Sequence, residues 1–297
     1  MTNGIVNVYK EKGFTSFDVV AKMRGIFHQK KVGHTGTLDP DAEGVLPVCL
    51  GSATKVCDVL TDKDKEYEAV LLLGLETDTQ DVTGTVLSER EVSVTEEEVR
   101  SVVSSFVGDI MQVPPMFSAL KVNGQKLCDL ARKGVEVERK ARPVTVHEIE
   151  ILDMQLPRVH MRVHCGKGTY IRTLCRDIGE RLGCGGCMEQ LVRTRVSDFA
   201  LRDALRLSEI EEALAEGKTD FIRPVDSVFM QYPAVTAAPE AKKLIDNGNR
   251  IPKELTDGDF EGGQTVRICD VSGRFIGLYS YEPKTGDYRP FKLFFDR

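Results

Sequence analysis

The sequence predicts an α+β protein in which a mixed, mostly antiparallel sheet is flanked by helices and followed by a small β-rich domain. Segments with the alternating hydrophobicity of strands are mixed with segments that carry the apolar stripe of a helix. Beyond about residue 230 the sequence pattern changes to that of short strands separated by turns. The length of 297 residues fits one large or two ordinary domains, and we place these at residues 1–229 and 230–297.

The first part of the chain is expected to form a strand, a capped helix and a glycine-rich stretch. Apolar residues alternate over residues 4–9, which predicts a strand. Thr15 or Ser16 can cap a helix over residues 17–28, because a hydroxyl side chain satisfies a free N–H of the first turn. Residues 32–51 are rich in glycine and have little helical pattern.

A second strand, a turn and a second helix follow. Apolar side chains alternate along residues 67–75, and residues 77–84 are typical of a turn. Thr95 and the three acids after it predict a helix start, because the helix dipole favours carboxylates in the first turn. We expect this helix to end near Gly108, before two prolines at 114–115 break the chain.

The remaining elements follow the same patterns, with glycines after several helix ends. Between residues 126 and 215 we expect a helix over 126–133, strands over 144–152 and 158–164, and helices over 169–182 and 208–215. In the C-terminal domain we expect a short helix over 239–245 and strands over 265–270, 275–281 and 291–295.

Charge is unevenly distributed, which matters more for polyanion binding than the net charge of −6. Residues 58–98 hold 13 acids and 3 bases, whereas residues 118–143 hold 7 bases and 3 acids. Residues 158–195 hold 8 bases and 3 acids, and residues 22–34 hold four bases and no acid. Two interpretations stay open, a nucleic-acid surface and ordinary solvated charge.

The sequence has no features of membrane, exported or nucleotide-cofactor proteins. No run of eighteen apolar residues could span a bilayer, and the first twelve residues do not resemble a signal peptide. The eight cysteines are scattered, as in reduced cytosolic chains. Neither a Walker loop nor a GxGxxG motif after a strand occurs. We therefore expect a cytoplasmic protein that contacts no membrane and uses no nucleotide cofactor.

The first candidate for chemistry is the segment GHTGTLDPDAEGVL at residues 33–46. Its glycines, threonines and proline predict a tight loop whose backbone can approach a ligand closely. Asp39 precedes Pro40, which holds Asp39 extended and presents its carboxylate at a fixed angle. The dipeptide alone is more often an ordinary turn, in which the aspartate bonds its own backbone.

The second candidate is CGKGTYIRTL at residues 165–174, where a strand runs through a glycine turn into a helix. Lys167 and the helix N-terminus suit a phosphate or another anion. Arg172 can form a bidentate pair with a carboxylate, either in a functional site or with a structural acid.

The third candidate is Tyr67, an aromatic residue between two glutamates at the start of a predicted strand. An exposed aromatic ring there could stack on a nucleic-acid base. A half-buried strand tyrosine is the more frequent outcome of this pattern.

A metal or dithiol site is an alternative. Cys184 and Cys187 have ligand-type spacing, and His160 and His164 form a second close pair on one side of a predicted strand. One CxxC without a second is a weak signal for zinc. The sequence therefore predicts no metal.

Five motifs, in this order, resemble those of the TruB family of tRNA pseudouridine synthases: GHTGTLDPDAEGVL (33–46), KEY (65–67), TDTQDVTG (77–84), PPMFSALK (114–121) and GKGTYIR (166–172). The resemblance extends over essentially the whole chain and is strongest over residues 4–200. It implies the pseudouridine synthase fold for residues 1–229, with an RNA-gripping insertion at about 115–143. It also implies a PUA-like domain from residue 230 that contacts the acceptor side of tRNA.

The resemblance implies roles for individual residues. Asp39 would be the catalytic aspartate, and Arg172 would pair with it. Tyr67 would stack on the target base and is the candidate for proton transfer. His34 would help to flip the base, and Leu191 would line the pocket. Further substrate contacts are expected from Gly36, Thr37, Lys121, Lys167 and Tyr170. One departure is Cys128, where the family pattern has a tyrosine.

The implied reaction isomerises a uridine in the T-arm loop of tRNA. It breaks the N–C glycosidic bond, turns the base and rejoins it through carbon, so neither a cofactor nor a protein partner is implied. Attack of Asp39 on the sugar, attack on the base and a glycal-type route all stay open. Burial raises the pKa of a carboxyl group, and a nearby cation such as Arg172 lowers it.

A rival hypothesis is a non-catalytic RNA-binding or RNA-folding protein that uses the same basic face. Such a protein needs no carboxylate facing the ribose. The combination of Asp39, Tyr67 and Arg172 in family motifs therefore favours the enzyme.

Overall fold

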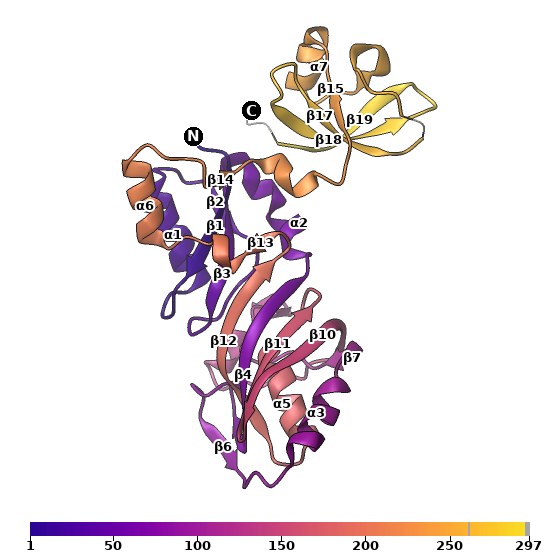
Figure 1. Cartoon of the computed structure of the whole chain (residues 1–297). Helices are drawn as coiled ribbons and strands as arrows, with labels where there is room; N and C mark the ends of the chain where they lie inside the picture. Colours follow the sequence, from indigo (N-terminus) through magenta and orange to yellow (C-terminus); the bar gives the residue numbers. More distant parts are fainter. Residues whose placement is uncertain (261, 295–297) are drawn as a thin grey trace.

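Two β-sheets organise the chain (Figure 1). The computed structural model describes residues 1–260 and 262–294. A ten-stranded sheet takes up the first part of the chain, and a five-stranded sheet forms a separate lobe at the C-terminal end. The predicted α+β architecture with a small β-rich C-terminal part is confirmed.

The larger sheet is mixed and mostly antiparallel. In spatial order its strands are β14 (Ile222–Arg223), β1 (Gly4–Lys10), β3 (Glu43–Leu50), β12 (Gly186–Val196), β4 (Lys65–Leu73), β11 (Arg158–Cys165), β10 (Arg142–Gln155) and β7 (Gly108–Gln112), with β2 (Val32–His34) beside β3 and β13 (Phe199–Ala200) beside β12. β3 and β12 run parallel, and the other described pairs run antiparallel.

Helices cover this sheet at two places (Figure 1). The four longer ones are α1 (Ser16–Ile26), α3 (Glu96–Ser104), α5 (Ile171–Arg181) and α6 (Leu207–Ala215). α1 and α6 pack against β1 and β3, whereas α3 and α5 pack against β4 and β11. Thr15 and Thr95 cap α1 and α3 as predicted, each accepting a hydrogen bond from the N–H three residues later. Such caps stabilise a helix by about 1 kcal/mol each.

Short elements complete this part of the chain. They are α2 (Cys57–Thr61), α4 (Leu127–Ala131), η1 (Gly51–Val56), η2 (Leu201–Asp203) and η3 (Val225–Phe229), with the hairpins β5 (Leu75–Thr77)–β6 (Val86–Glu89) and β8 (Lys121–Val122)–β9 (Gln125–Lys126). Among the described residues, none of the helices combines the length and the apolar character that a membrane span needs.

The smaller sheet has its own core. Its strands lie in the order β15 (Ala234–Thr236), β17 (Thr265–Cys269), β18 (Phe275–Glu282), β19 (Asp287–Leu293) and β16 (Ile251–Pro252), with η4 (Pro239–Ala241), α7 (Lys242–Asp246) and η5 (Lys253–Leu255) between them. Tyr279 and Tyr288 are fully buried inside it. Leu278 and Phe294 instead pack against Phe229 of the first part. Residue 295, the last of a predicted strand, lies outside the described residues.

Burial along β4 shows which face of the larger sheet is covered. Residues alternate between buried and half-buried, with Tyr67 on the buried side and Glu66 and Glu68 on the open side. β12 lies next to β4 at the centre of the sheet but is absent from the predicted strands. Its register places Arg193 opposite Tyr67.

Candidate active site

The loop between β2 and β3 carries Asp39 and is fixed at several points. Ser16, at the start of α1, accepts from the N–H of Leu38 at 2.8 Å and donates to its carbonyl at 3.2 Å. Lys10 is fully buried, and its Nζ donates to the carbonyls of Pro40 and Ala42 at 3.0 and 2.6 Å. Burial lowers the pKa of Lys10 to about 8. The loop therefore presents the Asp39 carboxylate from a rigid backbone.

Arg172 meets Asp39 through two contacts. Its Nε lies 3.0 Å from Asp39 Oδ2, and its Nη2 donates to Asp39 Oδ1 at 3.3 Å. The Arg172 side chain is 7% exposed and that of Asp39 40% exposed. Arg172 also donates to the carbonyls of Thr79 at 2.9 Å and Phe117 at 2.7 Å, and lies 3.6 Å from Asp81. One buried guanidinium thus joins three separate loops at the carboxylate.

Two opposing effects set the pKa of Asp39. Burial raises it above that of an ordinary aspartate, and the Asp81 carboxylate adds to the rise. The cations Arg172 and Lys10 lower it, but burial dominates. Asp39 is therefore harder to ionise than a free aspartate.

Activity should accordingly fall at low pH. Only an ionised Asp39 can serve the implied chemistry, so the single-turnover rate should drop as pH falls through its pKa. Because that pKa is raised, the drop should begin above the pH of about 3.9 at which a free aspartate titrates. Asp81→Asn removes a charge that raises the pKa, so its rate should persist to lower pH. If the fall of the rate at low pH occurs at the same or a higher pH in Asp81→Asn than in wild type, Asp81 does not raise the pKa of Asp39.

A cavity of about 660 Å³ opens at Asp39. This volume is in the range of small-molecule sites and can admit a nucleoside. Five of the predicted site residues line it: His34, Thr37, Asp39, Arg172 and Leu191. Apolar surface comes from Phe17, Phe117 and Met188. Four residues of the predicted insertion also line the cavity: Lys126, Cys128, Asp129 and Arg132.

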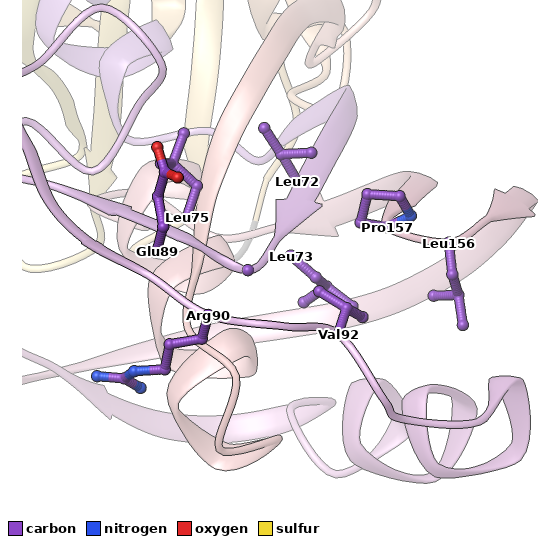
Figure 2. Close-up of a pocket in the computed structure, with 9 residues that line it drawn as sticks. Leu72, Leu73, Leu75, Glu89, Arg90, Val92, Leu156 and Pro157 are labelled. Carbon is purple, nitrogen blue, oxygen red and sulfur yellow. The ribbon is translucent and has the colours of Figure 1, made fainter.

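A second cavity, of about 490 Å³, lies at the far end of β4 (Figure 2). Its lining is mostly aliphatic, and Glu89 and Arg90 are its charged members. Asp39, Tyr67 and Arg172 do not line it. The predicted catalytic residues Asp39 and Arg172 therefore lie at the first cavity and not at the second.

Tyr67 is not among the residues that line the cavity. Its ring is 9% exposed, and burial raises its pKa, while Arg193 lowers it through its charge and a hydrogen bond to the hydroxyl. Arg193 is 1% exposed, and its Nε donates to the carbonyl of Val45 at 2.7 Å. Its Nη2 donates to the carbonyl of Gly36 at 3.1 Å. Arg193 therefore ties Tyr67 to the loop that carries Asp39.

His34 and Gly36 shape the start of this loop. The Gly36 N–H donates to Nδ1 of His34 at 3.3 Å. Burial, together with the charge of Arg193, lowers the pKa of His34, so its imidazole is neutral at neutral pH. Gly36 adopts a φ of +141°, which an L side chain rarely tolerates. The neutral imidazole of His34 therefore borders the cavity.

Three other predicted site residues lie outside the cavity. Tyr170 bonds to the Gln112 side chain: its N–H donates to Oε1 at 3.0 Å, and its carbonyl accepts from Nε2 at 3.3 Å. Lys121 is on the β8–β9 hairpin. Lys167 pairs with Asp62 at 3.0 Å. The structure therefore does not bring Lys121 or Lys167 to Asp39.

The basic stretch over residues 158–195 is largely neutralised by acids. Several of these acids come from the acidic stretch 58–98, in part because β4 pairs with β11 and β12. Besides the pairs of Arg172, the described pairs are Arg158–Glu189, Arg162–Glu68, Arg162–Glu150, Lys167–Asp62, Arg176–Asp177 and Arg195–Glu66. Among the described residues no ion pair engages Lys121, Lys126 or Lys133, which are exposed. The predicted insertion therefore carries exposed positive charge that no acid neutralises among the described residues.

The alternative zinc site is not assembled from the predicted residues. Cys184 and Cys187 are buried. His160 and His164 lie on one side of β11, as predicted, and this is the open side of the sheet. Within the described part of the chain, no group of three or more possible metal ligands includes either cysteine.

Three charged residues of this site were not predicted: Lys10, Asp81 and Arg193. Asp81 stands in one of the quoted motifs but carried no assigned role. Lys10 and Arg193 end or interrupt apolar strands, and a charged residue at a buried strand position is the signal that could have revealed them.

Comparisons with known proteins show the family of the chain. The model of the TruB family pseudouridylate synthase N-terminal domain matches residues 24–171. The model of the tRNA pseudouridylate synthase B C-terminal domain matches residues 172–230. A protein of Lachnoclostridium phytofermentans named tRNA pseudouridine synthase B is 53% identical over 98% of this chain and 99% of its own. One of the same name from Clostridium tetani is 44% identical over 93% and 94%.

Solved structures share the fold. A chain of a Cbf5-Nop10-Gar1 complex superposes with a TM-score of 0.73 at 27% identity, covering 99% of this chain and 85% of that one. A chain of an H/ACA RNP bound to a substrate RNA gives a TM-score of 0.71 at 26% identity, covering 99% and 86%. The chain therefore belongs to the TruB family of pseudouridylate synthases.

Proposed function

We propose that this protein converts a uridine in the T-arm loop of tRNA to pseudouridine, in the cytoplasm, with Asp39 as the catalytic carboxylate. Its family and its relatives named tRNA pseudouridine synthase B support uridine isomerisation in tRNA. The observation that carries the assignment to this site is the Asp39–Arg172 pair in a cavity large enough for a nucleoside.

The chemistry sets clear demands on this pair. The bond between ribose C1′ and N1 of uracil breaks, and a bond between C1′ and C5 forms, while the proton on C5 leaves and N1 gains one. No electrons are exchanged with a second reactant, so the proposal needs no cofactor. Asp39 supplies the negative charge beside C1′, and Arg172 holds that carboxylate in one orientation. Tyr67 is the proposed group for the proton transfer.

The target base has to leave its stack to reach Asp39. Flipping costs a few kcal/mol, and stacking on an aromatic ring returns about 1–3 kcal/mol. We assign the stacking to Tyr67, whose buried ring requires the cavity to open as RNA enters. His34 borders the entrance as a neutral ring, and Leu191 and Thr37 contact the flipped nucleotide.

RNA affinity is proposed to come mainly from the insertion, because its lysines are free of ion pairs among the described residues. The C-terminal lobe is proposed to be PUA-like and to contact the acceptor side of the tRNA. No protein partner is needed for either contact.

Removing the free lysines should change the salt dependence of RNA binding. Each phosphate contact contributes about 0.7–0.9 to the slope of log affinity against log salt. The triple variant Lys121→Ala, Lys126→Ala, Lys133→Ala should therefore bind tRNA more weakly, with a slope smaller by about 2. Lys218→Ala, on a surface lysine paired with Glu216, is the matched control and should leave the slope unchanged. An unchanged slope in the triple variant would assign the phosphate contacts to another surface.

The function is tested with the purified chain, an unmodified tRNA transcript and no other protein or cofactor. We expect pseudouridine at one uridine of the T-arm loop, and none in a transcript with cytidine at that position. Conversion of a uridine elsewhere would reject the T-arm target while keeping the isomerase. Tight binding without any conversion would overturn the enzyme and favour the RNA-folding hypothesis.

A further inference from the structure

Three potential metal ligands meet on the open face of the larger sheet, away from the Asp39 cavity. Asp64 directly precedes β4, His147 lies in β10 and His164 near the end of β11. One ligand atom from each lies within 4.8 Å of the other two. None of these residues lines the cavity or takes part in the chemistry described above.

The backbone brings these side chains together at an irregularity of the sheet. The register between β10 and β11 shifts after Val146, which faces Cys165, so that Glu148 faces His164. His147 is therefore the extra residue of a β-bulge. Bulges re-aim a side chain, and here His147 comes to lie beside His164, with ring centroids 4.8 Å apart.

Asp64 is held at its place by the neighbouring segment. Its carbonyl accepts a hydrogen bond from the N–H of Ser197 at 3.1 Å. Its Oδ2 lies 3.4 Å from Nε2 of His147. Two of the three ligands thus stand on strands and the third directly precedes one, which gives a site better defined geometry than long loops do.

Two imidazoles and one carboxylate form a donor set that suits a borderline divalent cation such as Zn²⁺. We propose that Asp64, His147 and His164 form a binding site for a divalent transition-metal ion, with water completing the coordination. A hydrogen bond between Asp64 and His147 alone would not require His164. The bulge nevertheless brings His147 beside His164. The exposed side chains give the ion an entry path, at 50% exposure for Asp64 and 38% for His147.

The bound ion would link the residue that precedes β4 to β10 and β11. β4 carries Tyr67 and β10 leads back from the insertion, so the ion would brace the part of the sheet that supports both. Because it binds the folded chain, the ion should raise Tm. Activity should not depend on it.

The experiment is calorimetric titration of the purified, metal-free chain with Zn²⁺, together with thermal unfolding. We expect one strong equivalent, a Tm increase at saturation, and at least about tenfold weaker binding in His164→Gln and in Asp64→Asn. His160→Gln alters a half-buried histidine on the same strand and face outside the cluster, and should bind as wild type does. Because the three substituted residues lie at the surface, an unchanged Tm of the metal-free variants serves as the folding control.

Cobalt substitution identifies the ligands. Co²⁺ bound by nitrogen and oxygen should show visible ligand-field bands without the near-ultraviolet charge-transfer band of a thiolate. A thiolate band would place the ion at a cysteine and overturn the proposal. Equal loss of Zn²⁺ binding in His160→Gln and His164→Gln, or no stoichiometric binding by wild type, would overturn it as well.

Discussion

Asp39→Asn should abolish pseudouridine formation while leaving tRNA binding intact. Asparagine keeps the size of the side chain but cannot supply a negative charge beside C1′. We expect the single-turnover rate to fall by at least about a thousandfold, since the residue acts directly in the bond-breaking step. Arg172 keeps its bonds to the carbonyls of Thr79 and Phe117 and its contact with Asp81, so the fold should survive. The measurement is the rate on one tRNA transcript, with the dissociation constant determined in parallel.

Asp41→Asn is the matched control for this variant. Asp41 lies two residues further along the same loop, is exposed and makes no bond to Arg172 among the described residues. Its substitution removes the same charge from the same loop, so it should retain most of the activity. Equal losses in the two variants would mean that loop charge, and not the Asp39 carboxylate, supports turnover.

The sequence predicted the parts of this site that depend on local pattern. Glycines and Asp-Pro marked the Asp39 loop, and the threonine caps marked the starts of α1 and α3. Alternating hydrophobicity marked β4, although its first residue is Lys65 and not Tyr67. The pairing of Asp39 with Arg172 came from family resemblance, because residues 133 positions apart carry no local signal of contact.

What the sequence did not predict depends on tertiary burial. β12 holds Glu189, Arg193 and Arg195 and therefore lacks the apolar pattern of a central strand. Sequence counts also suggested a basic surface over residues 158–195, but sheet pairing sets its arginines against acids of β4. A run of basic residues can be assigned to a basic surface only when the strand order is known. That order depends on contacts between residues far apart in the sequence.

We expect Arg193, which was not among the predicted site residues, to be important for turnover. It is fully buried, and among the described residues its guanidinium has no carboxylate partner within ion-pair distance. Its bonds go to the Val45 carbonyl, the Gly36 carbonyl and the Tyr67 hydroxyl. The charge therefore lowers the pKa of Tyr67, opposing burial, while the guanidinium connects Tyr67 to the loop that carries Asp39.

We expect Arg193→Lys to reduce kcat by about a hundredfold with little change in tRNA affinity, because a lysine keeps the charge but its single nitrogen cannot reproduce the spread, planar donors of a guanidinium. Arg193→Met should lose more, since it also leaves two buried carbonyls unpaired, at about 1–3 kcal/mol each. A lower Tm in these variants would not distinguish a structural role from a catalytic one. The deciding measurement is therefore a double-mutant cycle between Arg193 and Tyr67.

Tyr67→Phe by itself should keep RNA binding and lose turnover, because it removes the hydroxyl proposed for proton transfer. If Arg193 acts through that hydroxyl, Arg193→Lys should cost much less additional activity in the Tyr67→Phe background than in wild type. Fully additive losses would instead assign Arg193 to holding the loop alone. A fully active Tyr67→Phe enzyme would remove proton transfer from Tyr67 and leave Arg193 with the loop as its one catalytic connection.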